Sequence, residues 1–185
     1  MASNTTRQLI LLRHAKSAWP DDVPDHERPL APRGRRDAPA AGRWLRKSGH
    51  VPDRVLCSTA RRARETWQLA EEKLDAHPAT VLEDRVYGAS VADLLDLARQ
   101  TPADVGTLAI VGHDPAMRGL TLELAAQHPG DAEAEALGRV RTKYPTAAIA
   151  VLLFSGDWAE LSLGQAHLGE FVVPDDFHAG HGRQR

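Results

Sequence analysis

Four short runs of apolar residues, without polar residues at alternate positions, mark out the chain. They cover residues 9–12, 55–57, 108–111 and 147–154. Strands of a parallel sheet that are covered on both faces have this continuous pattern, whereas half-exposed strands alternate apolar and polar residues. We therefore predict four buried strands at these positions. Residues 80–82, Thr-Val-Leu, are a weaker candidate for a further strand.

Segments with helical spacing lie between these runs. Apolar residues recur at intervals of three and four within residues 38–45, 63–74, 91–98 and 120–125, which is the spacing of one helix face. The first predicted helix ends near Gly49, where a left-handed residue after the last turn is favourable. Strands that alternate with helices predict an α/β fold, a three-layer α/β/α sandwich with a mostly parallel central sheet.

Three stretches show neither pattern. Residues 19–32 carry four prolines among several acidic residues, and we expect a long, partly stiffened loop that forms a flap beside the functional site. Residues 129–145 begin acidic and become basic, and we expect a solvated excursion there. Residues 174–185 are rich in Asp, His, Gly and Arg and are expected to be a flexible C-terminal tail. Residues 1–173 then form a single domain.

Charge and cysteine content narrow the possible functions. The 185 residues include 23 Lys and Arg against 25 Asp and Glu, a formal net charge of -2. We expect no nucleic-acid partner, because no overall basic field is available. Cys57 is the only cysteine, which excludes an internal disulfide framework and makes a reducing cytoplasm the expected location. The apolar run before Arg13 is too short for a signal segment or a spanning helix, so no membrane association is expected.

Polar and reactive residues directly follow three of the predicted strands. Residues 13–17 read Arg-His-Ala-Lys-Ser, residues 58–62 read Ser-Thr-Ala-Arg-Arg, and residues 112–115 read Gly-His-Asp-Pro. Ligands of open parallel sheets bind outside the carboxyl ends of the strands, so all three segments are expected to line one pocket. Two histidines and at least two arginines there, with helix N-termini, indicate an anion site, and phosphate fits best.

These residue types suit phosphoryl transfer through a histidine. A neutral imidazole is a nucleophile toward phosphorus, and neighbouring cations keep it neutral by lowering its pKa. We predict that His14 attacks the phosphoryl group and that water later hydrolyses the phosphohistidine. The three equatorial oxygens are bound by Arg13, Arg62 and His113. These cationic groups supply the charge neutralisation that Mg²⁺ would otherwise supply, so we expect no metal and no other cofactor.

Each of these residues has a simpler interpretation when taken alone. A single histidine at a strand end, such as His113, is more often structural than catalytic. Arg62 has the alternative of a helix-surface position paired with Glu65. The agreement of three separate strand ends favours the shared site.

The same segments resemble the signatures of a known family. Residues 11–17, Leu-Leu-Arg-His-Ala-Lys-Ser, are similar to the Arg-His-Gly signature of the histidine phosphatase superfamily, and especially to its SixA-like phosphohistidine phosphatase branch. The resemblance extends over residues 8–154. Three later motifs resemble that branch in the same order, namely residues 27–30 with Gly34, residues 58–66 and residues 111–115.

This resemblance implies a phosphoglycerate mutase-like α/β domain without a metal cofactor. It implies the same roles for the same residues, with His14 as the phosphoryl acceptor and the other three groups around the phosphate. Residues 82–88 resemble the mutase-type segment that carries a catalytic acid, with Asp84 in register and Glu83 one residue off. The imidazole of a phosphohistidine needs less help to leave than an alkoxide, and the SixA-like branch manages without this acid. Asp84 is therefore a candidate acid, with a turn residue as its alternative.

Four further residues are candidates for supporting roles. Lys16 and Ser17 can add donors to the phosphate site, and Lys16 has the alternative of facing solvent. Arg28 either reaches a substrate anion from the flap or lies on the surface. Asp114 stands where the family commonly has Asn, and it is expected to cap the helix that follows.

The predicted function is a metal-independent phosphatase that uses a phosphohistidine intermediate and acts on phosphohistidine in a partner protein. The alternative is the same chemistry on a small phosphomonoester, such as a sugar phosphate or a nucleotide. A short, open pocket without an acid lid favours the protein substrate, and an ordered flap over residues 18–32 favours the small one. A phosphate-sensing domain without turnover is a third hypothesis. The sequence does not name the substrate, the partner or the oligomeric state.

Overall fold

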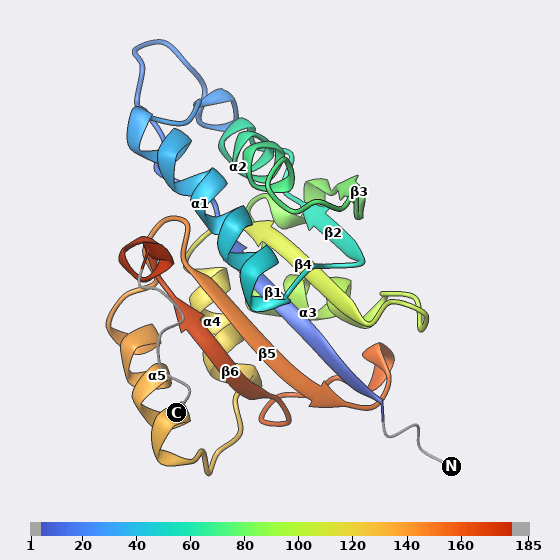
Figure 1. Ribbon diagram of the computed structural model, residues 1–185. Helices are drawn as coiled ribbons and strands as arrows, with labels where there is room; N and C mark the ends of the chain where they lie inside the picture. Colours follow the sequence, from blue (N-terminus) through green and yellow to red (C-terminus); the bar gives the residue numbers. More distant parts are fainter. Residues whose placement is uncertain (1–4, 179–185) are drawn as a thin grey trace.

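The computed structural model describes residues 5–178, which form a six-stranded sheet with helices on both faces (Figure 1). The strand order is β3-β2-β4-β1-β5-β6. The strands are β1 (Thr6–Arg13), β2 (Arg54–Cys57), β3 (Ala79–Leu82), β4 (Thr107–Gly112), β5 (Ile149–Ser155) and β6 (His167–Val172). The helices are α1 (Pro32–Ser48), α2 (Arg61–Glu71), α3 (Val91–Arg99), α4 (Ala116–Leu124) and α5 (Asp131–Thr142). The predicted three-layer α/β/α sandwich is confirmed.

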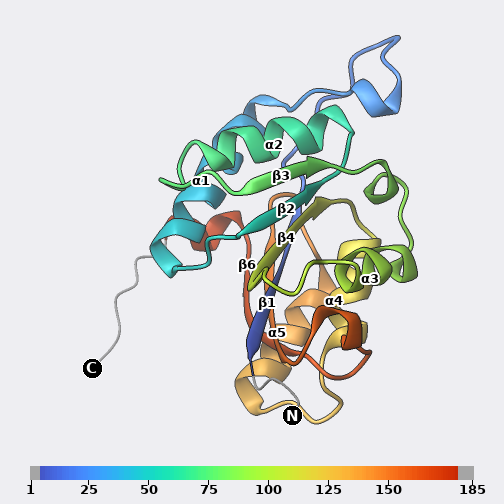
Figure 2. The ribbon, with the colours of Figure 1, turned by 90° about the vertical axis from the view of Figure 1, so that its right-hand side faces the viewer.

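The continuous apolar run of β1 contributes to two hydrophobic clusters. Leu9 and Leu11 pack with side chains of α3, α4 and α5 on one face of the sheet. Ile10 and Leu12 pack with side chains of α1 and α2 on the other face. All four leucine and isoleucine side chains are fully buried, and Figure 2 shows the two helix layers on opposite sides of the sheet. The run therefore has no polar positions because β1 has no solvent-facing side.

Four neighbouring strands of the sheet are parallel, whereas the two strands on the β6 side pair antiparallel with their neighbours. β3, β2, β4 and β1 run in one direction. The predicted strand in residues 147–154 forms β5, and β5 runs antiparallel to β1. Burial on both faces produces the same apolar pattern in either direction, so the pattern does not determine strand direction. β6 pairs antiparallel with β5 at the edge and was not predicted.

The expected solvated excursion over residues 129–145 is wrong, because this segment contains α5. Acidic residues lie in the first turn of α5 and basic residues in its last turn, an order that complements the helix dipole. Leu137 and Val140, three residues apart, are buried against the sheet. By contrast, α1 ends as predicted, because Gly49 adopts a left-handed conformation with φ of 79°.

The stretch predicted as a flap has no strand or α-helix of its own. We define the flap as residues 18–31. Its base is closed by an antiparallel bridge between Ser17 and Leu30, and by a hydrogen bond from the Ala18 N–H to the Pro29 carbonyl at 2.9 Å. One 3-10 helix, Asp25–Glu27, interrupts it. The flap projects outward beyond α1 and α2 (Figures 1 and 2).

The beginning of the expected C-terminal tail forms a 3-10 helix over Pro174–His178. Asp176 accepts a hydrogen bond from Arg139 of α5 at 2.8 Å, and Phe177 packs against the cluster beneath α1. The rest of that expected tail lies outside the described residues. Among the helices of residues 5–178, none has the length and apolar character needed to cross a membrane.

Candidate active site

Three neighbouring parallel strands end at the same edge of the sheet. Arg13, the last residue of β1, stands beside Gly112, the last residue of β4. β2 pairs in parallel with β4 and ends at the same level. His14, Ser58 and His113 follow directly after these three strands and therefore lie close together, as the sequence predicts.

His14 is buried and is held in one tautomer. The residue is only 7% exposed, and its Nδ1 lies 2.8 Å from the carbonyl oxygen of Ala15. A carbonyl only accepts, so Nδ1 carries the proton and Nε2 carries the free lone pair. Burial, followed by the charges of His113, Arg62 and Arg13, lowers the pKa of His14 to about 3. The ring is therefore neutral at neutral pH, which is the form that a nucleophile requires.

The second histidine faces the first. The ring centroids of His14 and His113 are 5.2 Å apart. Nδ1 of His113 lies 3.5 Å from Nη2 of Arg62, a donor, and Nε2 lies 2.8 Å from the hydroxyl oxygen of Ser58. This geometry places the His113 proton on Nε2. Burial and the charge of Arg62 lower the pKa of His113 to about 4, so both neighbouring rings are neutral at neutral pH.

Arg62 lies in the first turn of α2 and is buried rather than on the helix surface. Nη1 donates to the backbone carbonyl of Asp25 at 2.7 Å, and Nη2 donates to the Asp25 carboxylate at 3.1 Å. The alternative pairing of Arg62 with Glu65 is wrong, because Glu65 instead accepts from Arg61 at 2.8 Å and from the Leu30 N–H. Nε of Arg62 is buried and has no partner within residues 5–178.

Arg13 has a similar unpartnered donor. Its Nη1 donates to the carbonyl of Tyr144 at 2.7 Å, which fixes the guanidinium beside the start of β5. Its Nε is buried without a hydrogen-bond partner among the described residues. A buried donor without a partner is costly, and two guanidinium groups with such donors beside two neutral imidazoles fit an anionic ligand.

The candidate supporting residues build the base of the flap. Lys16 is exposed, and its backbone carbonyl accepts from the Ala31 N–H at 2.9 Å. Ser17 is buried and accepts a hydrogen bond from Nη2 of Arg28. Arg28 is buried, donates from Nε to the Ala18 carbonyl at 3.1 Å, and lies over the ring of Trp19. Arg28 therefore holds the flap together. Its burial contradicts the surface alternative, and its contact with a substrate anion stays a prediction.

The two carboxylates considered as proton donors lie on the segment after β3. Glu83 accepts hydrogen bonds on both carboxylate oxygens from the side chain of Arg85, and these bonds lower the pKa of Glu83. Asp84 is exposed in the first position of the 3-10 helix Asp84–Val86. Within the described residues, no hydrogen bond joins its carboxylate to His14 or His113.

Two further residues have positions that limit their roles. Cys57 is fully buried at the end of β2, and burial raises the pKa of its thiol to about 12, so it is not a reactive thiolate. Asp114 does not cap α4 as expected, because Pro115 occupies the N-cap position and no side-chain cap is formed. Asp114 instead lies 3.9 Å from Arg118 one turn along the helix.

Sequence reasoning missed Asp25 and Tyr87 at this site. The Tyr87 hydroxyl donates to the Asp25 carboxylate at 2.7 Å, and the Tyr87 ring lies edge-on to His113 at 5.7 Å. Both residues come from segments without regular periodicity, so no spacing rule brings them together. Within residues 5–178 no group of three or more metal-ligating side chains is present.

The match to a family model identifies the class of protein. Residues 9–90 match the histidine phosphatase superfamily (branch 1), and they include three of the residues described above: Arg13, His14 and Arg62. The chain belongs to the histidine phosphatase superfamily.

Individual relatives place it more narrowly. An uncharacterised protein of Mycobacterium tuberculosis is 46% identical over 163 residues, which cover 88% of this chain and 99% of that protein. The structure of the candidate phosphohistidine phosphatase SixA of Nakamurella multipartitia is 35% identical, with a TM-score of 0.79 over 93% of this chain and 98% of that chain. The candidate SixA of Agrobacterium tumefaciens is 26% identical, with a TM-score of 0.74 over 91% of this chain and 98% of that chain. The chain is thus similar to SixA proteins over nearly its whole length.

Proposed function

We propose that this protein is a metal-independent phosphatase that passes the phosphoryl group through His14 and acts mainly on phosphohistidine in a partner protein. The observation that carries the proposal is a buried, neutral imidazole with its Nε2 lone pair free, beside two guanidinium groups whose buried Nε atoms have no partner among residues 5–178. The similarity to SixA proteins supports the substrate class.

In the first step, Nε2 of His14 attacks phosphorus and forms an N–P bond while the bond from phosphorus to the leaving group breaks. Nδ1 keeps its proton throughout, because the Ala15 carbonyl accepts it at 2.8 Å. The imidazole thus develops positive charge as the N–P bond forms, and this charge makes it a good leaving group for the next step.

Arg13, Arg62 and His113 hold the equatorial oxygens in this step. The two guanidinium groups provide fixed donors where negative charge is spread in the transition state, and such donors are most effective in a site with little water. His113 donates to phosphate from Nε2, which in this structure forms a hydrogen bond with the Ser58 hydroxyl. A hydroxyl can also donate to phosphate, so Ser58 is a further candidate ligand.

In the second step, water attacks the phosphohistidine and inorganic phosphate leaves. The N–P bond breaks, the electron pair returns to Nε2, and the water proton passes to the phosphate product or to solvent. A histidine leaving group in the first step needs one proton or none, depending on whether the substrate imidazole is already protonated. Asp84 stays a candidate donor for ester substrates, whose alkoxide leaving group needs a proton.

The flap bears on the size of the substrate. Its outer part projects away from the sheet as a wall (Figures 1 and 2), whereas Asp25 in its 3-10 helix contacts Arg62 at the site. Trp19 on this wall is 74% exposed, and exposed aromatic side chains are common anchors for protein partners. The contact of the flap with Arg62 is the observation that favours the alternative, a small phosphomonoester.

The test is phosphate release from a phosphohistidine protein and from a panel of small phosphomonoesters, with a chelator present. We expect hydrolysis without added metal and preference for phosphohistidine. His14→Ala is expected to lose turnover while retaining the fold, and acid-labile labelling of the wild type but not of His14→Ala identifies the intermediate.

Each other result has a defined meaning. Preference for one small ester would replace the protein substrate by the alternative. Phosphate binding without turnover would support the phosphate-sensing hypothesis, and undiminished hydrolysis by His14→Ala would refute the mechanism.

A further inference from the structure

The carboxylate of Asp25 connects the flap to the proposed phosphate site. It accepts hydrogen bonds from Nη2 of Arg62 at 3.1 Å, from Nη1 of Arg28 at 3.0 Å and from the Tyr87 hydroxyl at 2.7 Å. The donors come from the flap, from α2 and from the segment after β3. Three converging donors hold one negative charge at a fixed place beside Arg62.

This charge persists throughout the neutral pH range. The hydrogen bond from Tyr87, and then those from Arg28 and Arg62, hold the pKa of the Asp25 carboxyl well below its usual range. The same bond raises the pKa of Tyr87. Asp25 is therefore an ionised group and not a proton donor, which separates it from the acid role considered for Asp84.

Asp25 lies at the solvent side of the site. Its side chain is 49% exposed, whereas the Arg62 side chain that it binds is 8% exposed and His14 is 7% exposed. In an in-line displacement the leaving group departs on the side of phosphorus opposite the nucleophile. Because His14 is buried and Asp25 is half exposed, we infer that the leaving group departs toward the more exposed side of the site, on which Asp25 lies.

The hydrogen bonds to Asp25 do not occupy all the N–H donors of Arg62. It takes one hydrogen bond from Nη2 with its carboxylate and one from Nη1 with its backbone carbonyl. Each terminal nitrogen of a guanidinium carries two N–H donors, so Asp25 leaves one N–H of Nη1 for a phosphate oxygen. The carboxylate therefore faces the leaving group without displacing the phosphoryl group.

We propose that Asp25 selects substrates by the charge of the leaving group, accepting neutral or cationic groups such as imidazole and rejecting groups that carry a negative charge. This inference rests on the proposed function, because it concerns the same site. Carboxylated or multiply phosphorylated small molecules are repelled, whereas the imidazole of a phosphohistidine is accepted. The negative charge of Asp25 thus favours phosphohistidine over small substrates that carry further negative charges.

The first experiment measures binding, which does not depend on turnover. Calorimetry compares 2-aminoethylphosphonate with 3-phosphonopropionate, two phosphonates whose tails differ in charge. The wild type is expected to prefer the cationic tail. Asp25→Asn and Asp25→Ser remove the charge and are expected to shift the affinity ratio by about tenfold toward the anionic tail, the effect of one unit charge at short range in a partly solvated site.

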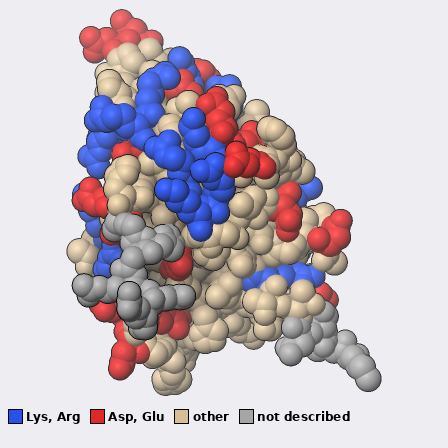
Figure 3. All heavy atoms as spheres, viewed as in Figure 1, with Lys and Arg blue, Asp and Glu red and all other residues tan. Residues whose placement is uncertain are grey.

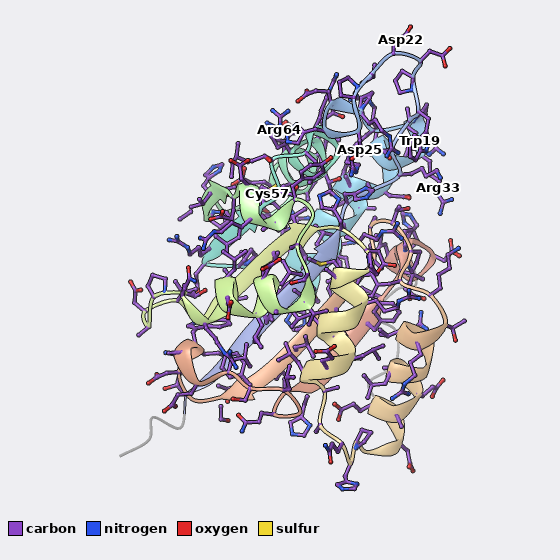
Figure 4. The ribbon with its side chains drawn as sticks, turned by 180° about the vertical axis from the view of Figure 1, so that it is seen from behind. Trp19, Asp22, Asp25, Arg33, Cys57 and Arg64 are labelled. Carbon is purple, nitrogen blue, oxygen red and sulfur yellow. The ribbon has the colours of Figure 1, made fainter. Side chains whose placement is uncertain are left out.

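Two control variants isolate the charge at this position. Asp22→Asn removes the same charge from the outer tip of the flap, whereas Asp25 lies closer to the body of the molecule (Figure 4). Asp22 has a φ of 57°, which Asn tolerates, and this variant is expected to change the ratio less than twofold. Asp25→Glu keeps the charge and is expected to keep the preference.

The inference would be overturned if the affinity ratio shifted no more in Asp25→Asn and Asp25→Ser than in Asp22→Asn. An equal gain in affinity for both phosphonates would also overturn it, because Asp25 would then compete with the phosphoryl group itself. Hydrolysis of phenyl phosphate and 4-carboxyphenyl phosphate by the same variants separates the two proposals. Binding that follows the prediction without any hydrolysis would refute the proposed function and leave the role of Asp25 intact.

Discussion

At the scale of single residues, an imidazole is positioned to attack phosphorus, and guanidinium groups are positioned to bind the phosphoryl oxygens. The hydrogen bond to the Ala15 carbonyl fixes the tautomer of His14, so no proton has to be removed before attack. Arg13 and Arg62 are each anchored by a backbone carbonyl through Nη1. Anchored guanidinium groups lose little entropy when they bind phosphate, because their forks are already oriented.

Replacing Arg62 tests whether its planar fork is needed or only its charge. Arg62→Lys keeps the charge but loses the bidentate geometry, and we expect kcat/KM for phenyl phosphate to fall by about 10²–10³-fold. Arg61→Lys is the matched control, since Arg61 is the preceding residue, has a 44% exposed side chain and pairs with Glu65. It is expected to stay within about twofold of the wild type. Equal losses in the two variants would contradict the assignment of Arg62.

The sequence predicts the residues whose positions follow from strand ends and helix starts. His14 and His113 directly follow β1 and β4, and Arg62 lies in the first turn of α2. Asp25 and Tyr87 are 62 residues apart in irregular segments, and their contact depends on how the flap folds back at its base. No local pattern in the sequence carries that information.

At the scale of elements, one close approach joins α1 to the segment after β1. A Cβ atom on Gly34, in the first turns of α1, would lie 2.2 Å from the carbonyl oxygen of Lys16. That oxygen also accepts the hydrogen bond from Ala31 that closes the flap. The glycine therefore sets how closely α1 packs against the backbone that follows His14.

Two glycine substitutions in helices are expected to have opposite effects on stability. Gly34→Ala forces backbone atoms apart and is expected to destabilise the protein by about 1–3 kcal/mol. Gly138→Ala, in α5, adds a Cβ with no neighbour within 4 Å and is expected to stabilise it by about 0.5–1 kcal/mol. Urea unfolding of both variants measures the difference. Stabilisation by Gly34→Ala would show that the loop and α1 can separate without cost.

The elements that the sequence misses are those with weak or mixed signals. β6 lies at the sheet edge, and its buried side chains, Leu168 and Phe171, are separated by three positions because a bulge interrupts the pairing of β5 with β6. This spacing resembles neither a buried strand nor a regular alternating one. α5 has only Leu137 and Val140 fully covered, too few for a clear helical face, although its charge order is typical of a helix.

At the scale of the whole molecule, the net charge hides how charges are distributed. The formal charge is -2, yet Lys and Arg side chains gather over α1 in the view of Figure 3. α1 carries a single acidic residue, Asp37, against six basic ones: Arg33, Arg35, Arg36, Arg43, Arg46 and Lys47. Composition predicts the average field of a protein, whereas the fold determines which face carries the charge.

The two buried neutral histidines connect the site to the stability of the whole fold. In the folded state the pKa of His14 is lowered to about 3 and that of His113 to about 4, whereas an unfolded histidine titrates near 6.5. Between these values the unfolded chain binds more protons, so the free energy of unfolding falls as the pH falls below about 6.5. The carboxylates with lowered pKa, such as Asp25, change the free energy of unfolding only at lower pH, because their pKa in the unfolded chain is near 4.

We therefore expect the two histidines to cost about 3–4 kcal/mol of stability between pH 7.5 and pH 5, since each pH unit below 6.5 costs up to about 1.4 kcal/mol per group. Urea unfolding across this range is compared with the double variant His14→Gln, His113→Gln. The variant retains every other histidine, so its curve against pH is expected to be flatter by the contribution of these two alone. Parallel curves would mean that the two rings are accessible to protons in the folded state, and would remove the physical basis for a neutral nucleophile at position 14.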